Sequence, residues 1–268
     1  MIVTKMGEVI PMEYRLKVSH RYKEITRVVN NVYWNIASEA LHSLYVGSYG
    51  RGTAIKTSDI DILIEFPVTE FNRFDNYKFN GQSQLLQSLR TTLLDRYPSS
   101  KIEGDGQVVK FDFSDGVAFE LLPAFRGCCG YVYPDSNGGG KWRSTRPREE
   151  QEAMRNKNNV SNGLLFDTCK HIRSLRDNHF QTRHLAGILI DSFVYKAIGD
   201  WVWSDYGRGS VVGAYEKSLL NCFYMTFGAM LSDSCQYRID APGSGDGITC
   251  ELEDVECLGN ILEKMATI

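Results

Sequence analysis

Two short stretches decide the fold: residues 47–53 are GSYGRGT, and residues 58–66 are SDIDILIEF. The first stretch is dense in glycine, which lets a backbone turn tightly and approach a ligand closely. The second alternates polar and apolar residues with a period of two, which predicts a β-strand with one buried face. In such a strand Asp59 and Asp61 project from the same face, roughly 6.6 Å apart along the chain. The sequence therefore predicts a glycine-rich turn followed by a strand that carries two carboxylates.

This combination of turn and strand indicates metal-assisted chemistry on a phosphate. Two carboxylates on one face repel each other unless a positive group lies between them. Hard cations with oxygen ligands, Mg²⁺ above all, meet that need, so Asp59 and Asp61 are candidate metal ligands and catalytic residues. The backbone of Gly47 and the hydroxyl of Ser48 can hold phosphate oxygens. For a D-x-D motif that stands alone, a solvated strand face is the simpler interpretation, but here the phosphate-binding turn accompanies it.

Two-metal chemistry usually requires a third carboxylate. Glu120 is the first candidate because it lies in the apolar stretch VAFELL at residues 117–122, where a charge is costly without a partner. Asp112, on the preceding predicted strand, is the alternative. Arg51, inside the glycine-rich turn, either contacts phosphate or braces the turn by pairing with a carboxylate, and both interpretations stay open.

The rest of the chain divides into a mixed half and a helical half. We predict a core over residues 1–157 and a helical domain over residues 158–268. In the core we expect one long helix over 12–45, a helix over 81–97, a strand pair at 107–113 and 117–122, and a long loop over 127–148. In the second half we expect helices at 149–158, 162–179, 183–199, 211–231 and 251–266, with a turn-rich loop at 240–247.

Composition excludes several classes of protein. The 268 residues are 43% hydrophobic and 24% charged, which is typical of a globular protein. No apolar run approaches the ~20 residues of a membrane span. The formal net charge of −3 disfavours strong binding to long nucleic acids. The seven cysteines have no regular spacing, which favours reduced thiols and a cytoplasmic location.

The motifs together resemble those of the nucleotidyltransferase superfamily that includes polymerase β. More narrowly, they resemble the bacterial cGAS/DncV-like nucleotidyltransferases (CD-NTases) of the SMODS type. FELLPAF at 119–125 resembles the third-carboxylate strand of that group, with Glu120 in place of the usual Asp. LLFDTCKHIR at 164–173 resembles the helix whose lysine binds the donor triphosphate, and DAP at 240–242 resembles a loop near the nucleotide pocket.

The resemblance implies an α+β fold: a polymerase-β-like nucleotidyltransferase core, with a mixed sheet and a long N-terminal helix, plus a C-terminal helical bundle. It implies template-independent synthesis of a cyclic di- or trinucleotide second messenger from NTPs, with release of pyrophosphate, in anti-phage signalling. ATP, GTP or both would be the substrates, with UTP as a further one. Asp59, Asp61 and Glu120 would hold two Mg²⁺ ions, or Mn²⁺. Lys170 would bind the donor triphosphate and Asp240 would lie at the nucleotide; a solvated basic helix face is the alternative for Lys170.

The resemblance also implies partners, and the residues leave other functions open. The implied partners are an effector that binds the cyclic product and a protein that conjugates to the C-terminal residues 266–268. The same carboxylates suit an enzyme that modifies a protein or tRNA, or one that makes linear oligoadenylate. A nucleotide-binding module with an inactive site is the non-enzymatic alternative. The motifs leave open the bases, the linkage, the ring size and any requirement for a trigger.

Overall fold

A computed structural model of the chain describes residues 2–204, 213–228 and 237–267. The chain forms two compact units. The sheet unit comprises residues 11–50 and 59–147, and the helical unit comprises residues 1–10, 51–58 and 148–268. Helix α5 (Pro147–Val160) joins the helical unit because its Met154 is buried in that unit's core. The structural division therefore lies after residue 147, whereas the sequence placed it after residue 157.

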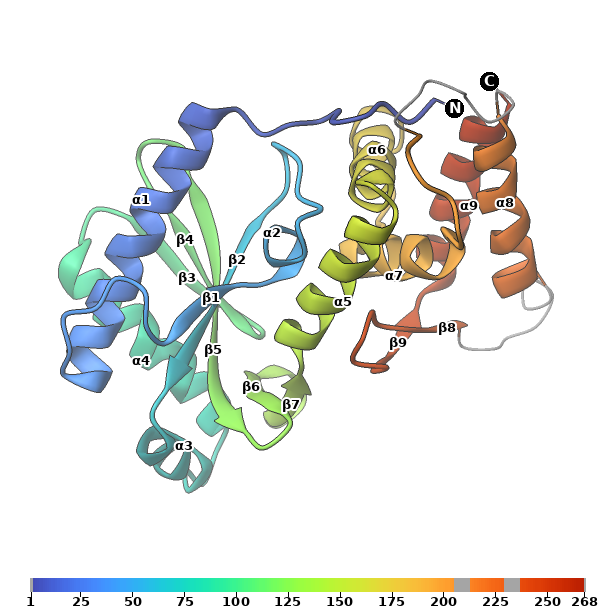
Figure 1. Ribbon diagram of the computed structural model, residues 1–268. Coiled ribbons are helices and arrows are strands. Elements are labelled where there is room, and N and C mark those ends of the chain that lie inside the picture. Colours follow the sequence, from blue (N-terminus) through green and yellow to red (C-terminus); the bar gives the residue numbers. More distant parts are fainter. Residues whose placement is uncertain (1, 205–212, 229–236, 268) are drawn as a thin grey trace. The chain divides into compact units, whose positions relative to one another are not determined.

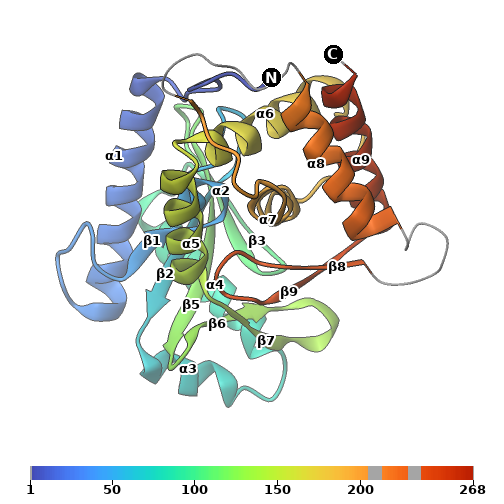
Figure 2. The ribbon, with the colours of Figure 1, turned by 45° about the vertical axis from the view of Figure 1, so that its right-hand side comes forward.

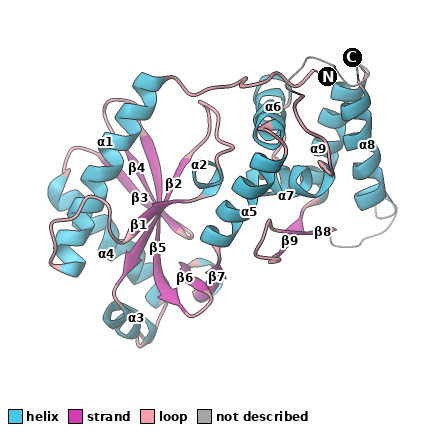
Figure 3. Cartoon of the chain, viewed as in Figure 1, coloured by secondary structure: helices cyan, strands magenta, loops and turns pink. Residues whose placement is uncertain are grey.

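The sheet unit is built on a seven-stranded mixed sheet (Figure 3). Its central order is β1-β2-β5-β4-β3, and β6 pairs with β5 and β7. Strands β2 and β5 run parallel, and the other neighbours run antiparallel. The strands are β1 (Ser43–Tyr45), β2 (Ile60–Phe66), β3 (Lys101–Asp105), β4 (Val108–Asp112), β5 (Ala118–Gly127), β6 (Gly130–Asp135) and β7 (Lys141–Thr145).

One face of this sheet is buried under helices (Figure 1). The even-numbered apolar residues of β2, Ile60 to Phe66, pack there with Phe119 and Leu121 of β5 and with the leucines of α4. The alternation expected at 58–66 is thus confirmed, and so are the helix near 81–97 and the strand pair around residues 114–116. The helices of the unit are α1 (Met12–Val29), a π-helical turn (Asn30–Trp34), α2 (Gly47–Arg51), α3 (Val68–Asp75), α4 (Gly81–Arg96) and a 3₁₀ turn (Asn137–Gly139).

The single helix expected over 12–45 is wrong beyond Val29. The chain widens into the π-helical turn and leaves it at Asn35, whose φ is 54°. The buried side chain of Asn30 then donates hydrogen bonds to two carbonyls of the following loop, Ser38 O at 2.9 Å and Leu41 O at 2.8 Å. The loop returns the chain to the sheet as β1. Apolar spacing misled the prediction because Leu41 is exposed rather than part of a helical stripe.

The loop expected over 127–148 is also wrong, because β6 and β7 form an antiparallel hairpin there. Lys141 and Arg143, on β7, lie opposite Asp135 and Tyr133. Asp135 accepts from Arg143 Nε at 2.5 Å, which lowers the pKa of the Asp135 carboxyl to about 2. Polar residues fill most of β7, so no apolar alternation marked it as a strand.

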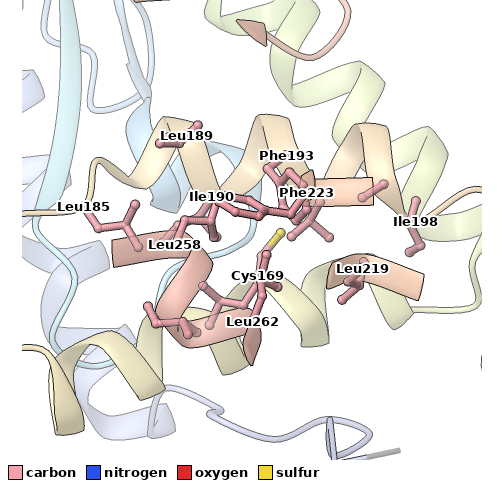
Figure 4. Close-up of a cluster of buried hydrophobic side chains, with 14 of the residues drawn as sticks. Cys169, Leu185, Leu189, Ile190, Phe193, Ile198, Leu219, Phe223, Leu258 and Leu262 are labelled. Atoms are coloured by element: carbon pink, nitrogen blue, oxygen red, sulfur yellow. The ribbon is translucent and has the colours of Figure 1, made fainter. Parts of the chain in front are cut away.

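In the described part of the helical unit, five helices pack around a core of their own. Leucine, isoleucine and phenylalanine side chains from α6, α7, α8 and α9 meet there around the buried Cys169 (Figure 4). Helices α8 and α9 lie side by side (Figures 1 and 2). Residues 211, 212 and 229–231 of the helix predicted at 211–231 lie outside the described residues. The elements are α5, α6 (Leu164–His179), α7 (Gly187–Ala197), α8 (Ala214–Phe227), β8 (Tyr237–Asp240), β9 (Gly247–Cys250) and α9 (Leu252–Ala266).

Within the described ranges, none of the helices has the length and apolarity that crossing a membrane requires. Five cysteines that the structure describes are free thiols: Cys128, Cys169, Cys222, Cys250 and Cys257. Cys235 lies outside the described residues.

The loop after α1 generates a stability prediction. Replacing Asn30 by Ala removes both hydrogen bonds that its buried side chain donates to the Ser38 and Leu41 carbonyls, so we expect a loss of about 1–3 kcal/mol in unfolding free energy. Urea denaturation followed by fluorescence measures this loss. The matched control is Asn31→Ala, because Asn31 is the exposed neighbour. Equal losses in the two variants would show that Asn30 does not hold this loop.

Candidate active site

The predicted carboxylates gather on the face of the sheet opposite the buried isoleucines. Asp61 and Glu120 are register partners in the parallel pairing of β2 with β5. Their backbones are fixed by the ladder, and Val46 N–H also donates to Asp61 O at 2.9 Å. Asp59 is exposed and lies just before β2 begins. The sheet therefore carries two of the three carboxylates side by side, with the third at its edge.

The glycine-rich turn lies directly against Asp61. Gly47 has φ +57°, in the left-handed region, and a Cβ built on it would stand 1.8 Å from Asp61 Oδ2. A larger residue at position 47 would displace the carboxylate as well as strain the backbone. Ser48 follows in the short helix α2 and is partly exposed. The structure thus places Gly47 next to the carboxylate of Asp61, and Ser48 follows Gly47 in α2.

Burial raises the pKa of the Glu120 carboxyl, and the negative charge of Asp59 raises it further. Lys110 opposes this rise from β4, where it lies in register with Glu120 and places its Nζ 3.8 Å from Glu120 Oε1. The same ammonium lies 2.6 Å from Asp105, and this contact raises the pKa of Lys110. Asp59, Lys110 and Glu120 all line one pocket of about 220 Å³. Four carboxylates and two lysines, Lys101 and Lys110, line this pocket, so the acids outnumber the cations and the pocket attracts positive charge.

The two candidates for the third carboxylate lie on different strands. Asp112 is on β4, in register with Ala118. Strand β5 lies between β4 and β2, so a whole strand separates Asp112 from Asp61. Glu120 is the direct neighbour of Asp61. Both Asp112 and Glu120 line the pocket, but the register favours Glu120 as the group that acts together with Asp61.

The donor set fits a divalent cation in its chemistry. Asp59, Asp61 and Glu120 offer only carboxylate oxygens, the ligands that Mg²⁺ and Mn²⁺ prefer. The rise in the Glu120 pKa caused by Asp59 shows that the acids repel each other as they stand. Across the part of the chain that the structure describes, no three His, Cys, Asp or Glu side chains are already arranged around a metal position. Binding would therefore have to draw these carboxylates together.

Arg51, the last residue of α2, is buried and pairs with two carboxylates. Its Nε donates to Asp191 at 2.8 Å and its Nη1 to Glu150 at 3.1 Å. The desolvation penalty of burial is outweighed by these two acids, so the pKa of Arg51 is raised. The sequence left open whether Arg51 contacts phosphate or braces the turn by pairing with a carboxylate. The two bonds to Asp191 and Glu150 are those of a brace.

Lys170 and Asp240 belong to the helical unit. Lys170 lies half-buried on α6, whereas Arg173 on the same helix is fully buried and bonded to Asp191. Asp240 ends β8 opposite Gly247, and its side chain is exposed. Their roles toward a nucleotide stay predictions.

The sequence matches a family model across residues 8–158, which is more than half of the chain. That model describes the Second Messenger Oligonucleotide or Dinucleotide Synthetase (SMODS) domain. The chain belongs to the SMODS family. The predicted resemblance to the bacterial CD-NTases is confirmed, and with it nucleotidyltransferase activity. Comparison with curated proteins gives no match.

Solved structures show the same polymerase-β-like fold for the SMODS protein, which confirms the predicted fold class. The Bradyrhizobium diazoefficiens CD-NTase CdnG in complex with GTP matches with a TM-score of 0.68 at 12% identity, covering 96% of this chain and 86% of that one. The Elizabethkingia meningoseptica CdnE cyclic dinucleotide synthase with GTP and Apcpp matches with a TM-score of 0.63 at 13% identity, covering 96% and 97%. The E. coli MS115-1 CdnC:HORMA-deltaN complex matches with a TM-score of 0.65 at 13% identity, covering 95% and 84%.

Sequence reasoning missed two residues of the SMODS protein that bear on the site. Lys110 was recoverable, because a tight turn at 114–116 sets the register that places it opposite Glu120. Asp191 was not, because it stands alone among apolar residues of α7 and its partners lie far away in the sequence. Only the folded chain brings Arg51, Thr53 and Arg173 to it.

The close approach at Gly47 generates a prediction for catalysis. We expect Gly47→Ala to lower nucleotide turnover by a hundredfold or more, because the new methyl displaces the Asp61 carboxylate. The control is Gly138→Ala, whose φ of +59° is similar but whose Cβ would meet nothing within 4 Å. Turnover by HPLC and thermal unfolding should be measured on both variants. Equal activity losses would trace the effect to backbone strain and not to the carboxylate.

Proposed function

We propose that this SMODS protein makes a cyclic di- or trinucleotide second messenger from NTPs, with release of pyrophosphate. The observation that carries the proposal is the pairing of Asp61 with Glu120 beside the turn at Gly47. That arrangement combines a place for phosphate with carboxylates that need a cation. ATP and GTP are the proposed substrates, with UTP as a further one. The GTP and Apcpp bound to the CdnE cyclic dinucleotide synthase support this substrate class.

The turn holds the donor nucleotide in this proposal. Backbone N–H at Gly47 and the Ser48 hydroxyl donate hydrogen bonds to oxygens of the triphosphate. Lys170 neutralises part of its charge, and Asp240 lies at the nucleotide. A fixed grip matters because transfer requires the α-phosphate and the attacking hydroxyl to be held in line.

Asp59, Asp61 and Glu120 would hold two divalent ions, Mg²⁺ or Mn²⁺. When bound, such ions lower the pKa of an acceptor ribose hydroxyl and stabilise the departing pyrophosphate. In this proposal Glu120 holds the ion nearer the acceptor, at the pocket that it lines together with Asp59 and Lys110. Lys110 limits the repulsion between Glu120 and Asp59 before ions arrive.

We further propose a cytoplasmic role in anti-phage signalling, where NTPs are abundant and an effector reads the product. A protein partner that conjugates to residues 266–268 completes the proposal, although Ile268 lies outside the described residues. The CdnC:HORMA-deltaN complex supports the general idea that a protein with this fold assembles with partners.

A product assay tests the proposed reaction. Purified protein is incubated with all four NTPs and Mg²⁺ or Mn²⁺, then treated with phosphatase and analysed by mass spectrometry. We expect a phosphatase-resistant cyclic species that is absent in the Asp59→Ala/Asp61→Ala variant. Thermal unfolding should show that this variant stays folded, because it loses repelling charges. A labelled protein or RNA in place of a small product would overturn the proposal in favour of macromolecule modification.

The strand register yields a ranking of acidic variants. Glu120→Gln should lower turnover by about a hundredfold or more, because it removes a metal-binding charge next to Asp61. Asp112→Asn should change turnover by no more than about threefold, because β5 separates it from Asp61. Initial rates over a range of Mg²⁺ concentrations measure both effects. The reverse ranking would make Asp112 the third ligand.

A further inference from the structure

The segment 51–58 lies between the two halves of the catalytic motif in sequence, yet it packs with the helical unit. It follows the turn at Gly47 and Ser48 and precedes Asp59. Ala54 and Ile55 are buried, and Gly52 lies so close to Phe166 that a Cβ on it would stand 2.6 Å from that ring. Thr57 donates a hydrogen bond to Asp177 of α6. The segment is therefore a strap embedded among side chains of the helical unit.

Asp191 of α7 is the anchor of this strap. Its Oδ2 accepts from Arg51 Nε at 2.8 Å and from the Thr53 hydroxyl at 3.0 Å, so two strap residues end on one oxygen. Asp191 is fully buried, and Thr53 is fully buried as well. A hydrogen bond to a buried carboxylate is stronger than one between neutral groups.

The anchor is itself held in place from α6. Arg173 donates Nη1 to Asp191 Oδ1 at 2.7 Å and Nη2 to Oδ2 at 2.9 Å, a two-pronged contact that fixes the plane of the carboxylate. Its Nη2 also donates to Gly187 O at 2.9 Å, which ties it to the start of α7. The second guanidinium of the cluster is that of Arg51, and Glu150 on α5 accepts a hydrogen bond from it. The cluster thus contains two guanidinium groups and two carboxylates, and Arg173, which lies outside the strap, makes two of the bonds that orient the Asp191 carboxylate.

From this geometry we infer that Asp191 is a positioning residue for nucleotidyl transfer. Through Arg51 and Thr53 it holds the end of α2, the short helix that begins with Gly47 and Ser48. The role rests on the proposed function, because it serves the grip of Gly47 and Ser48 on the donor triphosphate. Asp191 touches no substrate in this scheme. It sets where the donor-binding turn stands.

Thr53 offers a cleaner test than Asp191, whose replacement would leave buried guanidinium groups without a partner. Thr53→Val removes one hydrogen bond from the strap and keeps the shape of the side chain, and Thr53→Ser keeps the hydroxyl. The matched control is Thr168→Val. Thr168 is equally buried in the same unit, and its hydroxyl bonds Tyr215 and Leu164 O but not the strap.

The measurements are kcat and KM for the donor NTP, thermal unfolding, and hydrogen–deuterium exchange of residues 46–61. We expect Thr53→Val to lower kcat/KM by about tenfold, mainly through KM, and to speed exchange at residues 47–50. Thr53→Ser should restore both values. Thr168→Val should lose comparable thermal stability and leave kinetics and exchange in 46–61 as in the wild type. If the two valine variants behave alike in kinetics and exchange, Asp191 is only structural.

The exchange measurement also separates this inference from the proposed function. If the wild-type protein makes no product, the synthase proposal fails. The positioning role then stands or falls on exchange at 47–50 in Thr53→Val against Thr168→Val. Faster exchange in the first variant alone supports the role, and equal exchange overturns it.

Discussion

Glu120 stands beside Asp61 in the pairing of the parallel strands β2 and β5, and the charge of Asp59, just before β2, repels the Glu120 carboxylate. The sheet unit can hold this repulsion because its other face is firmly packed. Ile60, Ile62 and Leu121 are almost fully buried on that face, and a one-residue slip of β2 would expose them. The same packing that stabilises the strands thus fixes the carboxylates where they are electrostatically unfavourable. A bound cation would relieve that repulsion. The packing of the core therefore determines the geometry of the candidate site.

The buried cluster around Asp191 orients side chains more than it stabilises the fold. Replacing a buried ion pair by apolar groups is often neutral or stabilising, so stability alone gives weak reason for two arginines in this core. Such groups make hydrogen bonds in fixed directions, because a guanidinium donates and a carboxylate accepts at set angles. Here the directed bonds end on Arg51 and Thr53, in the strap that separates Ser48 from Asp59. Between Gly50 and Asp59 the chain leaves the sheet unit for eight residues, 51–58. Two of these residues, Arg51 and Thr53, bond Asp191.

Local patterns predicted the parts of the structure that depend on local causes. The alternation at 58–66, the leucine spacing of α4 and the Ser-Asp-Gly turn before β5 each reflect a period or a turn that neighbouring residues determine. The end of α1 at Val29 and the β6–β7 hairpin depend on partners elsewhere, the loop carbonyls that Asn30 reaches and the polar strand that β6 pairs with. The candidate site divides in the same way. The motif named Asp59, Asp61 and Glu120, whereas Lys110 required the strand register and Asp191 required the complete tertiary fold.

The length of the Glu120 side chain and its distance from Lys110 both affect how this carboxylate is held. Its side chain is one methylene longer than the aspartate usual in the family, and Lys110 lies opposite it on β4. Lys110 makes its short contact, 2.6 Å, with Asp105, and stays 3.8 Å from Glu120. That longer distance exceeds a hydrogen bond, so the ammonium attracts the Glu120 carboxylate without locking it. The extra methylene gives the Glu120 carboxylate a longer reach than an aspartate would have at this position. The glutamate therefore keeps a carboxylate beside Asp61, where the proposed reaction requires one.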